Sequence, residues 1–123
     1  MSSPTPLVSQ VFEWSTLQPV KIPNGERRQV FDGPTATVDK LHCHITSLAA
    51  GQNSGAPRRH LEEEVLIVKE GQVEVHIDGR TQNAGAGSVL FFAAGAVTAL
   101  RNVGDGPATY YVINYFTPKT PKS

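Results

Sequence analysis

Short runs of alternating apolar and polar residues, each closed by a turn rich in glycine or proline, follow one another along most of this chain. Residues 72–77 alternate strictly and end at Asp78-Gly79, a pair typical of a tight β-hairpin. Further runs rich in branched and aromatic residues cover 64–70, 88–93 and 108–116. No segment keeps a helical period. The pattern predicts an all-β sandwich or barrel.

The size of the chain fits one such domain, because 123 residues are too few for two hydrophobic cores. We expect a barrel over 36–116, preceded by an N-terminal arm with short strands over 1–35 and followed by a frayed tail over 117–123.

The charge balance and the cysteine count limit the partners and the compartment. Lysine plus arginine equals aspartate plus glutamate at 11 each, so no net positive charge attracts nucleic acid or anionic membrane. No apolar run is long enough to span a bilayer, and no secretion signal is seen at the N-terminus. A single cysteine agrees with a reducing compartment. We therefore expect a soluble cytoplasmic protein that binds neither nucleic acid nor membranes.

Residues 57–71 carry the densest group of chemically active side chains. If this segment is one strand, Arg58, His60, Glu62 and Glu64 lie on the same side. Imidazole and carboxylate groups are the usual protein ligands of iron, manganese, nickel and zinc. Two such ligands rarely hold a metal ion alone, so further ligands would have to come from elsewhere in the chain.

The same segment resembles the first conserved motif of the cupins. In that motif a histidine pair precedes a glutamate, and a glycine follows the glutamate after six residues. Here six residues separate Glu64 from Gly71, and His60 stands at the position of the second histidine. The residues from Gly87 through Gly95 to Asn102 match the second cupin motif in spacing. The resemblance implies a cupin-type jelly-roll β-barrel, with a structural role for Asn102.

The chain departs from the cupin motifs at the positions that usually bind the metal. Arg58 replaces the first histidine, Thr98 replaces the histidine of the second motif, and Ala93 replaces a proline. Of the four ligands that the resemblance implies, only His60 and Glu64 remain. A guanidinium group is always charged and has no lone pair to donate, so Arg58 would repel a cation and attract an anion. We therefore expect no metal cofactor.

Two further histidines leave a metal site open as an alternative. His42 and His44 share one face of an alternating segment and, with His60 and Glu64, would rebuild a site for a divalent transition metal. Because alternating strands usually bury their apolar side, we expect Leu41, Cys43 and Ile45 to face the core and both histidines to face outward.

Three functions are compatible with these residues. The first is a metal-independent cupin acting on a small, anionic molecule, with His60 as general base, Glu64 polarising it, and Arg58 and Thr98 binding substrate. The second is a metal-dependent dioxygenase or isomerase with an unusual ligand set. The third is a non-catalytic ligand-binding module, in which Arg58 and Glu64 form a buried ion pair. Analogy with small cupins also predicts a homodimer.

Overall fold

A computed structural model describes residues 5–122, so the parts of the expected arm and tail that fall on 1–4 and 123 lie outside the described residues. The elements in this part of the chain are a 3-10 turn η1 (Trp14–Thr16) and the strands β1 (Val20–Ile22), β2 (Gly25–Gly33), β3 (Lys40–Leu48), β4 (Arg58–Arg59), β5 (Glu63–Glu70), β6 (Gln72–Ile77), β7 (Arg80–Gly85), β8 (Val89–Phe92), β9 (Val97–Asn102) and β10 (Ala108–Phe116). Among the described residues, no helix is long and apolar enough to cross a membrane.

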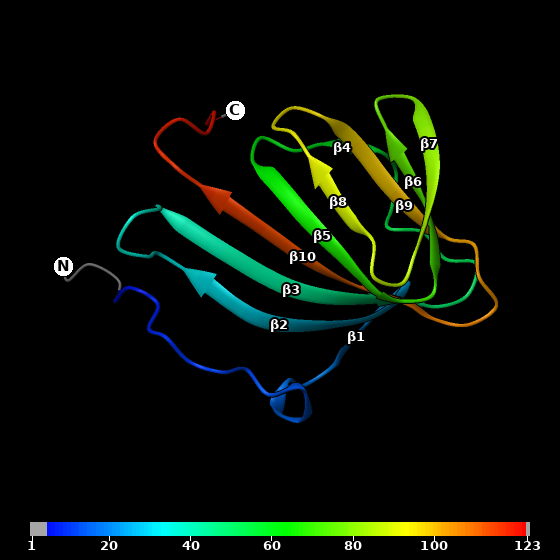
Figure 1. Ribbon diagram of the computed structural model, residues 1–123, viewed down its shortest axis with the longest axis horizontal. Coiled ribbons are helices and arrows are strands. Elements are labelled where there is room, and N and C mark those ends of the chain that lie inside the picture. The colour runs from blue at the N-terminus through cyan, green and yellow to red at the C-terminus, as the bar shows by residue number, and fades with distance from the viewer. Residues whose placement is uncertain (1–4, 123) are drawn as a thin grey trace.

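The strands form two antiparallel sheets that pack into a jelly-roll barrel (Figure 1). The six-stranded sheet has the order β1-β2-β3-β10-β5-β8, and the four-stranded sheet has the order β4-β9-β6-β7. The predicted all-β barrel is confirmed. The strand β2, which falls within the expected arm, pairs with β3 over most of its length and is an integral part of the larger sheet.

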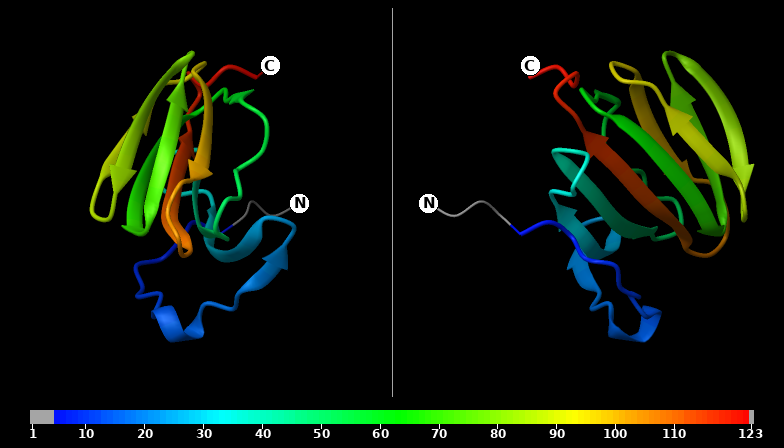
Figure 2. Two further views of the ribbon diagram at one scale, coloured as in Figure 1. Left: turned by 90° about the vertical axis from the view of Figure 1, so that its right-hand side faces the viewer. Right: turned by 60° about the vertical axis from the view of Figure 1, so that its left-hand side comes forward.

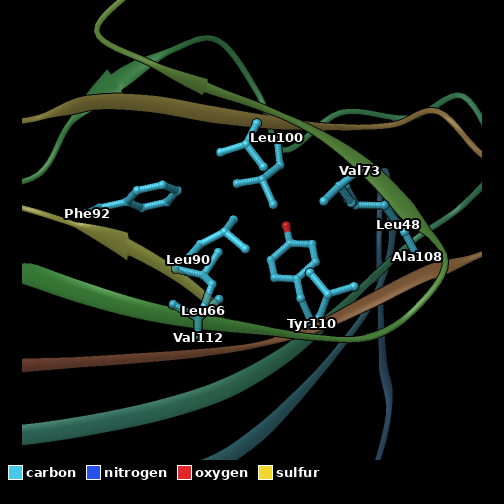
Figure 3. Close-up of a cluster of buried hydrophobic side chains, with 11 residues drawn as sticks. Leu48, Leu66, Val73, Leu90, Phe92, Leu100, Ala108, Tyr110 and Val112 are labelled. Carbon is cyan, nitrogen blue, oxygen red and sulfur yellow. The ribbon is translucent and has the colours of Figure 1, made fainter. Parts of the chain in front are cut away.

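The hydrophobic core lies between the two sheets (Figure 3). The strands β5, β6, β8 and β10 contribute alternate residues to it, as the sequence pattern requires. The buried members are Leu48, Leu66, Val68, Val73, Val75, Leu90, Phe92, Leu100, Ala108, Tyr110 and Val112. The alternation of residues 72–77 is confirmed, because Val73 and Val75 are both buried in this core, and Leu66 and Leu100 also border the cavity described below.

Two polar residues fix the loops that close the barrel. Asp78 and Gly79 form the predicted hairpin between β6 and β7, with positive φ angles of 48° and 83° that suit a tight turn. Asn102 is buried, and its Nδ2 donates hydrogen bonds to the carbonyl oxygens of Leu48 and Gly106. The structural role expected of Asn102 is confirmed by these bonds.

The N-terminal arm covers part of the outer face of the six-stranded sheet. The arm runs along the β1–β2 side of the molecule, away from the four-stranded sheet (Figure 2). Its Phe12 ring packs against Phe31 of β2 with centroids 5.6 Å apart. The Trp14 ring lies 4.4 Å from the Arg28 guanidinium carbon and 4.0 Å from Nζ of Lys69. Both faces of this sheet are therefore partly covered.

This cover explains why the expected orientation of β3 is wrong. Cys43 and Ile45 are buried, as expected, but they lie on the outer face of the sheet beside β2 residues that contact the arm. Burial raises the pKa of the Cys43 thiol to about 11. The alternate residues of β3, which include His44, consequently face the barrel interior.

Candidate functional site

A cavity of about 370 Å³ opens between the two sheets. Its lining is polar at one end and merges with the apolar core at the other. The charged or titratable lining residues are Arg27, His44, Arg58, His60, Glu62, Glu64 and Tyr110. The other polar lining residues are Asn24, Thr46, Ser54, Thr98 and Asn114. A small polar molecule is therefore the class of ligand that this volume and lining suit.

The segment 57–71 is not the single strand that the alternation predicted. It breaks after Arg59: β4 pairs with β9 of the smaller sheet, and β5 pairs with β10 and β8 of the larger one. The backbone N–H of Gly95 donates to the carbonyl oxygen of His60 at 2.8 Å, which anchors the connecting turn. Because the chain crosses from one sheet to the other here, Arg58 and Glu64 belong to different sheets while lining the same cavity.

His60 lies between two carboxylates at this crossing. Its Nδ1 is 3.6 Å from Oε1 of Glu62, and its Nε2 is 3.7 Å from Oε1 of Glu64. The Glu62 side chain is only 13% exposed and also lines the cavity. Both distances exceed a hydrogen bond, and they leave His60 free to contact a ligand.

Glu64 is buried, with 6% of its surface exposed, and Asn114 of β10 is its polar partner. Nδ2 of Asn114 donates to Oε2 of Glu64 at 3.2 Å. Among the described residues no ion pair joins Arg58 to Glu64, so the buried pair that would have replaced a metal's charge is not formed. Asn114 was not identified from the sequence, although a lone amide among the apolar residues of β10 is a signal that could have found it.

Two arginines line the cavity without a carboxylate partner. In the part of the chain that the structure describes, neither Arg27 nor Arg58 forms an ion pair. The adjacent Arg28 lies on the opposite face of β2, stacked on Trp14 and paired with Glu26 at 3.2 Å. Arg27, by contrast, is exposed to solvent and lines the cavity. Strand alternation separates them and turns Arg27 toward the cavity.

The structure places His44 on the cavity wall, contrary to its expected outward orientation. Nδ1 of His44 is 2.7 Å from Nε2 of His42, and Nδ1 of His42 is 3.0 Å from Oδ1 of Asp32. Burial, with contributions from the charges of Arg27 and His42, lowers the pKa of His44 to about 4. His44 is therefore neutral near pH 7.

Thr98 and Tyr110 complete the polar wall. Thr98 is buried, lines the cavity, and is the cross-strand partner of Arg58 between β9 and β4. Burial raises the pKa of Tyr110 to about 12, partly opposed by a hydrogen bond with Thr46 and supported by the charge of Glu64. Tyr110 thus keeps its hydroxyl proton, and it can donate a hydrogen bond.

The donor side chains do not fit a metal ion. Within residues 5–122 no three histidine, cysteine, aspartate or glutamate side chains gather closely enough to hold one. His42 and His44 contact each other through ring nitrogens, and in the described chain they form no such group with His60 and Glu64. Arg58, which stands where the cupin motif has its first metal-binding histidine, lines the cavity at this site.

Comparison with known proteins agrees with this architecture. The sequence profile described as "Cupin domain" matches residues 44–114. No curated protein matches the sequence.

Among solved structures, an RmlC-like cupin from Shewanella frigidimarina aligns with a TM-score of 0.72 at 16% identity, covering 91% of this chain and 95% of that one. The polyketide cyclase RemF from Streptomyces resistomycificus aligns with a TM-score of 0.71 at 17% identity, covering 88% and 80%. A sugar phosphate isomerase of the cupin superfamily from Silicibacter pomeroyi aligns with a TM-score of 0.68 at 20% identity, covering 89% and 77%. At these identities the likeness shows the fold alone, and the neighbours differ in function.

Proposed function

This chain belongs to the cupin domain family, and we propose that its cavity binds a small anionic molecule and moves a proton on it without a metal ion. One observation carries the proposal: Arg27 and Arg58 line the same cavity as His60 and Glu64, and neither arginine is neutralised by a carboxylate in the described chain. Both arginines are exposed to solvent where they line the cavity, so they need no internal partner and are free to bind an anion that enters it.

The roles of the other residues follow from their chemistry. Arg58 and Thr98, direct partners across β4 and β9, would bind a carboxylate or phosphate group. His60 would take or give the proton, and Glu64 would stabilise the charged imidazole. An isomerisation, cyclisation or elimination needs no more than this set of groups. A binding module without chemistry would need only the arginines, so anion binding is the first step to test.

The test is to titrate the isotope-labelled protein with inorganic phosphate and with succinate, following amide chemical shifts. We expect saturable binding of at least one probe, with shifts at the cavity residues. Loss of one charge-assisted hydrogen bond weakens binding by about tenfold or more, so Arg58→Gln and Arg27→Gln should each do so. Arg80→Gln, on the exposed strand β7, is the matched control and should bind as the wild type does. If neither probe binds saturably, or if binding survives both cavity variants, the proposal is wrong.

A further inference from the structure

A continuous chain of three polar side chains runs from the surface to the cavity along β2 and β3. Asp32 and His42 are cross-strand partners, with Oδ1 and Nδ1 3.0 Å apart. His42 Nε2 and His44 Nδ1 are 2.7 Å apart, and His44 lines the cavity. The Asp32 side chain is 37% exposed and that of His42 is 13% exposed, so the chain begins in solvent and becomes progressively buried.

We propose that Asp32, His42 and His44 form a proton relay between solvent and the cavity, and that Nε2 of His44 is the group that exchanges a proton with the bound molecule. The inference rests on the proposed function, because a relay is useful only if the cavity binds a molecule that gains or loses a proton. It adds a second proton-handling group on β3, whereas His60 lies in the turn between β4 and β5.

The two hydrogen bonds admit one arrangement in which both imidazoles are neutral. Asp32 is an acceptor only, so His42 must donate from Nδ1. His42 Nε2 is then bare and accepts the Nδ1–H of His44. That in turn leaves Nε2 of His44 without a proton, on a ring that faces the cavity. The carboxylate thus fixes both tautomers, as the buried aspartate does in a serine-protease triad.

Proton transfer then proceeds by exchange along the chain. A proton leaves the bound molecule and forms a bond to Nε2 of His44. The Nδ1–H bond of His44 breaks, and its proton passes to Nε2 of His42. His44 ends neutral with its tautomer reversed, the molecule is left as its conjugate base, and the positive charge rests on His42 beside Asp32.

The surrounding charges favour this end state. Arg27 faces His44 from β2 and disfavours a positive charge there, and burial lowers the pKa of His44 to about 4 in the same direction. Asp32 stays ionised: burial opposes this, but hydrogen bonds with His42 and Lys40 outweigh it and lower the pKa of Asp32. On the other side of His42, its cross-strand partner is the neutral Asn114 of β10. The partner of Asn114 on the next strand, β5, is the carboxylate Glu64.

Long-range ¹H–¹⁵N spectra of the histidine side chains test the relay without a substrate. At about pH 8 we expect both His42 and His44 to carry their proton on Nδ1. On lowering the pH, the proton that the chain of side chains takes up should rest on His42 beside Asp32, as in the end state above. His44 should reverse to the Nε2–H tautomer in the same step while remaining neutral. A hydrogen bond that merely holds β3 to β2 would not produce this coupled reversal.

Variants and a ligand probe complete the test. Asp32→Ala removes the acceptor and should abolish the single Nδ1–H tautomer of His44, whereas Asp105→Ala, at an exposed loop carboxylate, should leave it unchanged. Phosphate, if it binds, should shift the Nε2 resonance of His44. The relay is overturned if His44 carries its proton on Nε2 at about pH 8 or becomes doubly protonated, or if Asp32→Ala leaves its tautomer unaltered. Absence of binding by both phosphate and succinate, with an intact reversal, would instead refute the proposed function and leave the relay's geometry standing.

Discussion

Asn114 of β10 and Glu64 of β5 are direct partners across the two strands, and the amide donates to the carboxylate at 3.2 Å. This bond gives the buried Glu64 a neutral partner in place of a metal ion or an arginine. The stability of the barrel should therefore depend on Asn114 more than on either cavity arginine.

Replacing Asn114 with alanine should destabilise the fold by about 2 kcal/mol, because it removes a hydrogen bond to a buried charged group. Urea unfolding at about pH 7 measures the change. Asn83→Ala, at an exposed position of β7, is the matched control and should change stability by less than about 0.5 kcal/mol. In a background of Glu64→Gln, where no charge needs stabilising, Asn114→Ala should cost clearly less. An equal cost in both backgrounds would contradict the role given to this pair.

The sequence could predict the elements that depend on local chemistry. The hairpin at Asp78-Gly79, the inward alternation of β6 and the structural Asn102 all follow from turn geometry and strand periodicity. The orientation of β3 could not be predicted in the same way. Alternation shows that Cys43 and Ile45 share a face, but it does not show which face is inside when an arm from a distant part of the chain covers the other.

The break between β4 and β5 was also hidden from the sequence. No glycine or proline occurs from His60 to Glu62, so no local signal marks the crossing between sheets. The crossing depends on pairing with β9 and β10, which are remote in sequence. That Arg27 and Asn114 line one cavity also follows only from the assembled sheets, which bring β2 and β10 together with β4 and β5.

The lowered pKa of His44 makes the stability of the protein depend on pH. The unfolded chain binds a proton at this histidine below about pH 6.5, whereas the folded chain does so only near its pKa of about 4. Stability from this group is present above pH 6.5 and is lost as the pH falls through that window. Urea unfolding measures how much the free energy of unfolding falls between about pH 7 and about pH 4.5. This fall should be smaller by about 1–2 kcal/mol in His44→Gln than in the wild type. His76→Gln, the control on β6, should retain the wild-type loss, and an unaltered slope in His44→Gln would refute the prediction.

Two glycines of the cupin motifs have nearly equal φ angles but different surroundings, so replacing each with alanine distinguishes the cost of backbone strain from the cost of steric contact. Gly71 has φ +87° and Gly87 has φ +88°. A Cβ at Gly71 would lie 2.6 Å from the carbonyl oxygen of Pro107, whereas one at Gly87 meets nothing within 4 Å. Gly87→Ala should cost about 1–2 kcal/mol from the left-handed backbone alone, and Gly71→Ala should cost more by at least that amount. Thermal unfolding compares the two, and equal losses would show that the β5–β6 turn relaxes to admit the methyl group.

The homodimer expected from family analogy stays a prediction, and the outer face of β5 and β8 is where we place its contact. Ile67, Val89 and Phe91 are exposed there by 37%, 66% and 57%. A charge in such an apolar patch disfavours association, so Phe91→Glu should weaken dimerisation by at least about tenfold. Sedimentation velocity measures this, with Val11→Glu in the exposed arm as control. A monomeric wild type at about 100 μM would exclude a dimer of even moderate affinity.

Metal content is the measurement that separates the charge-substituted site from the usual cupin centre. Because Arg58 borders the cavity and no three suitable donors gather in the described chain, iron, manganese, nickel and zinc should each bind far below one equivalent. Elemental analysis after incubation and dialysis gives the content, and thermal unfolding should show no stabilisation by any of the four ions. The variant Arg58→His restores the histidine of the first motif and should raise zinc retention if that arginine excludes cations. Near one equivalent in the wild type, lost in Glu64→Ala but kept in Glu13→Ala, would overturn the metal-free site and with it the anionic ligand.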